Sequence, residues 1–215
     1  PIELPGLGSA GISTDPDSTR AFVSYTSYNE PRTIYECDVV AGTLGAIWAR
    51  PETPVDPESV IVRRIHATSK DGTKVPMFVV HRKDLDTSRP HPTLLYGYGG
   101  FNISMTPRFI STNFPFYDAG GIYVVANLRG GGEFGESWHR AGMLESKQNV
   151  YDDLYACAEM LIDDGLTSSA QLAVMGGSNG GLLTGVAVTQ RPELWSAAIS
   201  AVPLLDMLRY HQFLM

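Results

Sequence analysis

The sequence predicts an α/β protein in which helices cover a doubly wound, mostly parallel sheet. Four short apolar runs are typical of strands buried on both faces: 93–99, 121–130, 171–175 and 195–204. Stretches 149–165 and 181–191 show the apolar spacing of helices, and they alternate with these runs. Such alternation is the pattern of a parallel sheet with crossover helices.

Residues 1–50 carry a different pattern and are predicted to form antiparallel strands. The ranges 21–29 and 32–40 are rich in aromatic and β-branched residues, with a turn signal at 29–31 between them. Residues 45–50 are a predicted third strand. Because three strands do not easily form a stable unit alone, we expect this meander to belong to a larger sheet.

Residues 51–60 contain three prolines and are predicted to be a linker. The ranges 60–69 and 75–82 then flank a turn signal at 70–73, which predicts a hairpin. In the predicted helix 149–165, Asn149 is the expected N-cap and Gly165 the expected end. Its apolar face is expected to consist of Val150, Leu154, Cys157, Leu161 and Ile162.

The composition excludes several classes of function. The 215 residues are 43% hydrophobic and 18% charged, an ordinary globular balance. The formal net charge of −7 and the absence of a Lys/Arg run predict no nucleic-acid or membrane partner. Cys37 and Cys157 are too few for a disulfide-stapled scaffold and predict a reducing, cytoplasmic location. No Cys/His cluster has the spacing of metal ligands, so we expect no metal. We also expect no cofactor. The protein is expected to be a monomer.

The segment 176–180 fits the pattern G-x-S-x-G around Ser178. It lies between the predicted strand 171–175 and the predicted helix 181–191, the context of a nucleophile elbow. There the serine hydroxyl would stand at the carboxyl end of a strand and at a helix N-terminus, which favours a developing negative charge. The alternative is a glycine-rich helix entry with Ser178 as its N-cap.

For two further glycine-rich stretches, the residue types alone favour a structural interpretation over a functional one. "YGYGGFN" (96–102) reads as a turn with packed aromatic side chains, although in an α/β-hydrolase this loop supplies half of the oxyanion hole. "RGGGEFGE" (129–136) is predicted to be a structural loop beside the elbow, held by an ion pair between Arg129 and Glu133. His139, next to Trp138, is expected to pack rather than to react.

These three stretches occur in order and together resemble the prolyl oligopeptidase family of serine peptidases, in its prolyl endopeptidase branch. The resemblance implies that 1–50 are the last strands of a β-propeller, 51–60 a linker, and 61–215 the first part of an α/β-hydrolase catalytic domain that is incomplete at its C-terminus.

The resemblance also implies roles for four residues. Ser178 matches the nucleophile, while the backbone N–H of Asn179 and the hydroxyl of Tyr98 match the two oxyanion donors. Phe101 matches an aromatic wall of the pocket for the substrate proline. The expected ligands are therefore short proline-containing peptides.

The rest of a catalytic triad is not expected in this chain. After Ser178 the only acidic residues are Glu193 and Asp206, and the only histidine is His211. Asp206 and His211 follow too soon, because the intervening chain allows about one helix and one strand. We read them as a helix face or a domain contact, and we expect the triad Asp and His farther downstream.

The predicted function is a serine peptidase that cleaves short peptides on the carboxyl side of proline through an acyl-enzyme. Residues 1–215 alone are expected to be inactive. Three alternatives stay open: a related peptide macrocyclase or transpeptidase, a non-catalytic hydrolase-fold binding protein, and a lipase or esterase. The last is weakened by "YGYGGF" in place of an HGGG loop.

Overall fold

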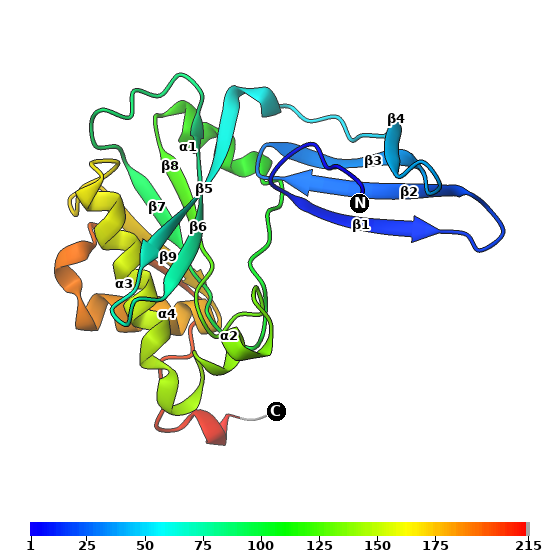
Figure 1. Cartoon of the computed structure of the whole chain (residues 1–215). Coiled ribbons are helices and arrows are strands. Elements are labelled where there is room, and N and C mark those ends of the chain that lie inside the picture. Colours follow the sequence, from blue (N-terminus) through cyan, green and yellow to red (C-terminus); the bar gives the residue numbers. More distant parts are fainter. Residues whose placement is uncertain (214–215) are drawn as a thin grey trace. The chain divides into compact units, whose positions relative to one another are not determined.

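The computed structural model describes residues 1–213, which form two compact units (Figure 1). The first unit comprises Pro1–Arg63, Val80–Lys83 and Thr106–Ala119. The second unit comprises Arg64–Val79, Asp84–Met105 and the described residues from Gly120 onward. All four residues with predicted roles therefore belong to the second unit.

The first unit contains a four-stranded antiparallel sheet in the order β1-β2-β3-β4. Its strands are β1 (Ser9–Thr14), β2 (Arg20–Ser27), β3 (Glu30–Asp38) and β4 (Thr43–Ala49). The last three correspond to the predicted strands, although β3 begins within the expected turn. β1 was not predicted, because its small and polar residues lack apolar alternation. It is held through backbone pairing, with Ile12 opposite Val23.

A second sheet has six strands in the order β10-β9-β7-β8-β6-β5. Its strands are β5 (Val60–Thr68), β6 (Lys74–Arg82), β7 (Thr93–Tyr96), β8 (Ile122–Ala126), β9 (Leu172–Gly177) and β10 (Ala197–Ala201). β7 pairs in parallel with β8 and β9, and β9 pairs in parallel with β10. The predicted α/β class with its parallel strands is confirmed, and the predicted hairpin β5–β6 lies at one edge.

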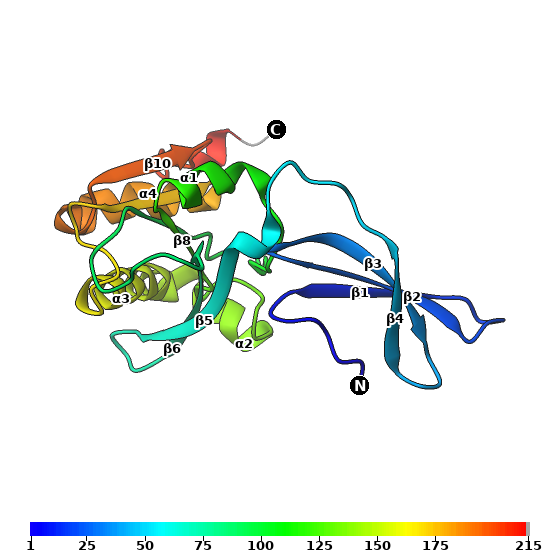
Figure 2. The ribbon, with the colours of Figure 1, turned by 90° about the horizontal axis from the view of Figure 1, so that it is seen from above.

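Two long helices, α3 (Gln148–Asp163) and α4 (Asn179–Gln190), are neighbours (Figures 1 and 2). The shorter helical elements are α1 (Phe114–Asp118), α2 (Glu136–Arg140) and the 3₁₀ turns η1 (Pro57–Ser59), η2 (Ser111–Asn113), η3 (Leu144–Ser146), η4 (Pro192–Leu194) and η5 (Tyr210–Gln212). Among residues 1–213, no helix has both the length and the apolar character needed to cross a bilayer.

The predicted apolar face of α3 is confirmed. Val150, Leu154, Cys157 and Leu161 are fully buried in one core with residues of β6 to β9 and with Leu183 of α4. Ile162 packs against the edge of this core. Burial of these side chains joins the two helices to the sheet and so sets where α4 begins relative to β7.

The predicted N-cap of α3 is wrong. The helix begins at Gln148, and its N-cap position is Lys147, which makes no side-chain capping bond. The turn η3 runs directly into the helix, and Val150 N–H donates to Lys147 O at 3.1 Å, so this N–H has an acceptor without a side-chain cap. Asn149 instead donates to Ala141 O at 2.9 Å. Gly165 follows the helix with φ +73°, as expected for its end.

Candidate active site

Ser178 occupies the sharp turn between β9 and α4. Its backbone has φ 54° and ψ −115°, a left-handed conformation that is strained for any residue with a Cβ. The turn is held from both sides: Ser178 N–H donates to Ala201 O at 2.9 Å, and Gly181 N–H donates to Ser178 O at 2.9 Å. The serine is exposed. Its hydroxyl makes no capping bond to α4, which speaks against a role as N-cap.

Two of the glycines around Ser178, Gly176 and Gly180, are required by close backbone contacts. A Cβ on Gly176 would overlap the carbonyl of Gly180, and a Cβ on Gly180 would lie 2.6 Å from Gly97 O. The first contact lets the strand fold back onto its own helix. The second brings the start of α4 against the loop that follows β7, so two segments far apart in sequence form one site.

Tyr98 and Asn179 are joined directly. The side-chain amide nitrogen of Asn179 donates to Tyr98 O, and a Cβ on Gly100 would lie 2.5 Å from that same nitrogen. The Tyr98 ring also lies beside the helix start, with Cδ2 3.6 Å from where a Cβ on Gly180 would stand. Because Asn179 is the first residue of α4, its backbone N–H lies among those that have no intrahelical acceptor.

Phe101 follows this loop with its side chain 63% exposed. Phe101 and Asn102 have φ values of 54° and 56°, two consecutive left-handed residues that are not glycine. Asn102 N–H donates to Gly130 O at 3.1 Å, which anchors this strained turn to the second glycine-rich loop. The Phe101 ring is therefore exposed on a backbone that is restrained by this hydrogen bond.

The predicted ion pair between Arg129 and Glu133 is wrong. Arg129 pairs with the fully buried Asp153 of α3, at 2.6 Å, and with Asp71 in the β5–β6 turn. Glu133 instead accepts hydrogen bonds from the backbone N–H of Met105 at 2.9 Å and from Asn127 at 3.1 Å. Arg129 and Glu133 lie on opposite ends of the glycine turn 130–132, and their side chains bind different partners. The loop is held by charge, as expected, but through acids that lie far away in sequence.

The prediction that Trp138 and His139 pack is consistent with their contacts. Trp138 Nε1 donates to Leu128 O at 3.0 Å, and His139 Nδ1 lies 2.8 Å from Gly130 O. Asp206 pairs with Arg209, and His211 lies exposed in η5. Neither Asp206 nor His211 forms a hydrogen bond with Ser178 among residues 1–213.

Lys147 is a residue near the site that sequence reasoning missed. Its Nζ donates to Gly99 O at 2.8 Å and to Asn179 Oδ1 at 3.4 Å. Burial lowers its pKa from 10.5 to about 8. No motif marks this lysine, and only the fold brings it to the loop.

A cavity of about 490 Å³ in the second unit does not involve these residues. Its lining residues are Thr68, Lys70, Asp152, Tyr155, Ala156, Glu159, Gln190 and Arg191. Arg191 is already paired with Glu159 and Glu193, so this charge is not free for a ligand. In the part of the chain that the structure describes, no group of three His, Cys, Asp or Glu side chains is placed to hold a metal ion.

Comparisons with known proteins agree on one family. The model of the prolyl oligopeptidase family matches residues 107–214. A prolyl endopeptidase of Elizabethkingia meningoseptica is 42% identical over 213 residues, which cover 99% of this chain and 30% of that protein. The chain thus spans less than a third of the length of this relative.

Solved structures give the same result. A prolyl endopeptidase structure superposes with a TM-score of 0.92 and 54% identity, covering 98% of this chain and 31% of that one. Prolyl oligopeptidase B from Galerina marginata, bound to a 35mer hydrolysis and macrocyclization substrate, has a TM-score of 0.89 and 33% identity, covering 96% of this chain and 30% of that one.

Proposed function

Since this chain belongs to the prolyl oligopeptidase family, we propose that the protein containing it is a serine peptidase that cleaves short peptides on the carboxyl side of proline. The observation that carries the proposal is the backbone of Ser178. An exposed serine with positive φ, placed between a parallel strand and a helix, is typical of a nucleophile elbow. Strain of this kind persists where the surrounding structure holds it, and such residues cluster at active sites.

In the proposed reaction, Ser178 Oγ attacks the carbonyl carbon of the substrate proline and gives its proton to a general base. The amine then leaves with a proton, and water hydrolyses the acyl-enzyme. The backbone N–H of Asn179 and the hydroxyl of Tyr98 are the proposed donors to the oxyanion. Their proximity, through the Asn179 side chain and the Tyr98 carbonyl, supports this pairing.

The proposal needs an acid and a base that residues 1–213 do not bring to Ser178. We place both in the part of the relatives' length that this chain does not span. Phe101 is the proposed wall of the proline pocket. Its exposed, uncharged ring offers a pyrrolidine ring a flat apolar surface and offers no counter-charge to a basic side chain.

We also propose that residues 1–50 are the last strands of a β-propeller, 51–60 a linker and 61–215 the first part of an α/β-hydrolase domain. The four antiparallel strands β1 to β4 support the first assignment, because a propeller blade is a four-stranded sheet of this kind. The parallel sheet with α3 and α4 supports the last.

Labelling of the full-length gene product tests the nucleophile. A fluorophosphonate should modify Ser178 in the wild type, and Ser178→Ala should lose both labelling and cleavage of a proline-containing chromogenic peptide. Modification of another serine, with Ser178→Ala still active, would remove Ser178 from this role.

A second outcome of the same chemistry is macrocyclisation, favoured by the likeness to prolyl oligopeptidase B of Galerina marginata. There the amine of the peptide itself, rather than water, would attack the acyl-enzyme. Mass spectrometry separates the two, since the cyclic product is lighter than the linear product by one water. A long substrate that yields only linear products would exclude the transfer reaction for that peptide.

A further inference from the structure

Lys147 is held at the start of α3 by its backbone. It follows the turn η3 directly, its N–H donates to Leu144 O at 3.0 Å, and its carbonyl accepts from Val150 N–H at 3.1 Å. Leu144, at the start of that turn, has φ 49°. The lysine side chain therefore leaves from a restrained point on the helix.

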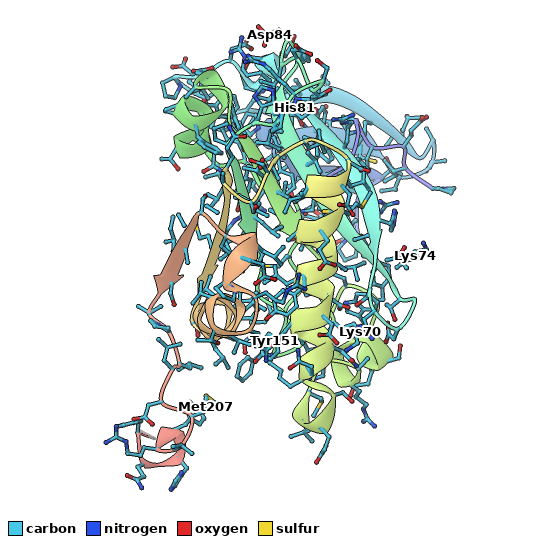
Figure 3. The ribbon with its side chains drawn as sticks, turned by 90° about the vertical axis from the view of Figure 1, so that its left-hand side faces the viewer. Lys70, Lys74, His81, Asp84, Tyr151 and Met207 are labelled. Carbon is cyan, nitrogen blue, oxygen red and sulfur yellow. The ribbon has the colours of Figure 1, made fainter. Side chains whose placement is uncertain are left out.

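The ammonium group reaches two segments that lie on either side of it in sequence. Its acceptors are Gly99 O, in the loop after β7, and Asn179 Oδ1, at the start of α4. The ring of Tyr151, labelled on α3 in Figure 3, lies 5.9 Å from the lysine nitrogen. One cation thus connects three elements of the second unit.

Lys147 has no carboxylate partner among residues 1–213. The aromatic group facing it is Tyr151, whose own pKa is raised by burial. Because the lysine is half-buried without an anion, desolvation disfavours its charge and lowers its pKa. The hydrogen bonds to the two oxygens are the interactions that offset this penalty.

These bonds also determine how the Asn179 amide is oriented. Its oxygen faces the lysine, and its nitrogen donates to Tyr98 O. An amide has one accepting and one donating end, so a cation on the oxygen side keeps the donating end toward the loop. The carbonyls of two successive residues, Tyr98 and Gly99, are thereby held from outside the loop, one by Asn179 and the other by Lys147.

We propose that Lys147 is a positioning residue of the oxyanion site, which holds the Tyr98 loop against the start of α4 through Gly99 O and Asn179 Oδ1. The inference rests on the proposed function, because it assumes that Tyr98 and Asn179 bind the oxyanion. Lys147 does not touch the substrate in this proposal. It acts on the transition state through the placement of the Tyr98 hydroxyl.

A double-mutant cycle in the full-length gene product tests the proposal. The four proteins are the wild type, Lys147→Met, Tyr98→Phe and the double variant, and kcat and KM are measured for one proline-containing peptide. Lys147→Met keeps the length of the side chain and removes its charge and donors. We expect kcat to fall about 10- to 100-fold with little change in KM, since small misplacements at a reacting centre have effects of this size.

The second arm of the cycle distinguishes positioning from a general structural role. In the Tyr98→Phe background, Lys147→Met should change kcat by less than about 3-fold, because the hydroxyl that it positions is gone. An equal fall in both backgrounds, or an unchanged kcat in the first, overturns the proposal. Lys70→Met is the matched control, since Lys70 is exposed in the β5–β6 turn (Figure 3), and it should leave kcat unchanged in both backgrounds.

Two further measurements distinguish loss of folding and failure of the proposed function from loss of positioning. Melting temperatures show whether each variant folds, and Lys147→Gln, which removes the charge and shortens the side chain but stays polar, supplies the cycle if Lys147→Met does not fold. Fluorophosphonate labelling of Ser178 in the wild type separates this proposal from the function on which it rests. A wild type that is not labelled at Ser178 contradicts the proposed function, whereas a labelled wild type with an additive cycle contradicts only the role of Lys147.

Discussion

The side-chain amide of Asn179 donates a hydrogen bond to the carbonyl oxygen of Tyr98, a residue 81 positions earlier in the sequence. This bond links the residue after Ser178 to the loop after β7. Both proposed oxyanion donors are therefore parts of one connected arrangement. The contribution of each residue to catalysis or stability can be tested with single substitutions.

Tyr98→Phe removes the phenol and leaves the ring. We expect kcat to fall about 10²- to 10³-fold, the loss seen when one oxyanion donor is removed from a hydrolase. KM should change little, since the hydrogen bond is made mainly in the transition state. Steady-state kinetics with two peptides of different leaving groups measure both constants. Equal kcat in wild type and variant would reassign Tyr98 to packing.

Gly176→Ala should destabilise the protein, because its new Cβ would overlap the backbone carbonyl of Gly180. Overpacking against atoms that cannot move aside destabilises by about 1–3 kcal/mol. The neighbouring Gly177→Ala is a matched control, since its Cβ would meet nothing closer than 3.9 Å. Urea denaturation of the two variants compares them. Similar midpoints would mean that the elbow is looser than its backbone contacts indicate.

Asp153→Ala should also destabilise the protein, through Arg129. It leaves a guanidinium group with a side chain only 5% exposed and without its buried partner. Removing one member of a buried pair destabilises by about 3–5 kcal/mol. Asp71→Ala removes a partner that is about half exposed, and should have an effect of at most about 1 kcal/mol. Urea denaturation again gives the difference, and equal effects would contradict the central role of Asp153.

Asp71 should add an acid-sensitive part to the stability. Its hydrogen bond from Arg129, followed by that from Thr73, lowers its pKa from 3.8 to about 2. A lowered folded-state pKa stabilises the fold above the unfolded value, and this contribution is lost as the pH falls from 3.8 toward 2. Melting temperatures across this range should fall less steeply for Asp71→Asn than for the wild type. Parallel curves would show that Asp71 is not coupled to Arg129 in solution.

Lys147 should add a second pH-dependent part, in the alkaline range, and here it is the charged form that destabilises the fold. Because burial lowers its pKa from 10.5 to about 8, its charged form destabilises the fold below pH 8, and this penalty is relieved as the pH rises from 8 to 10.5. The melting temperature of Lys147→Met, relative to the wild type, should therefore be higher at pH 7 than at pH 10. A constant difference for Lys147→Met would show that its ammonium group is solvated.

Much of the site could be predicted because its signals are local. Ser178 was predicted from a strand, a glycine turn and a helix that follow one another, and one of the contacts that hold its turn, between Gly176 and Gly180, lies within a few positions. Tyr98 and Phe101 needed the family resemblance, since a glycine-rich loop with aromatic residues has a commonplace structural reading. Their roles stay predictions until the variants are measured.

The sequence by itself determined the periodic elements and the elbow, because buried faces and tight turns depend on which residues stand a few positions apart. Only the tertiary structure decided which charges meet. Arg129 was expected to pair within its own loop, yet it binds Asp153 and Asp71, 24 and 58 positions away. Lys147 reaches Gly99, 48 positions away. The physical reason is that a long charged side chain takes the partner that the packing of helices and strands brings within its reach, and that packing is a property of the whole core.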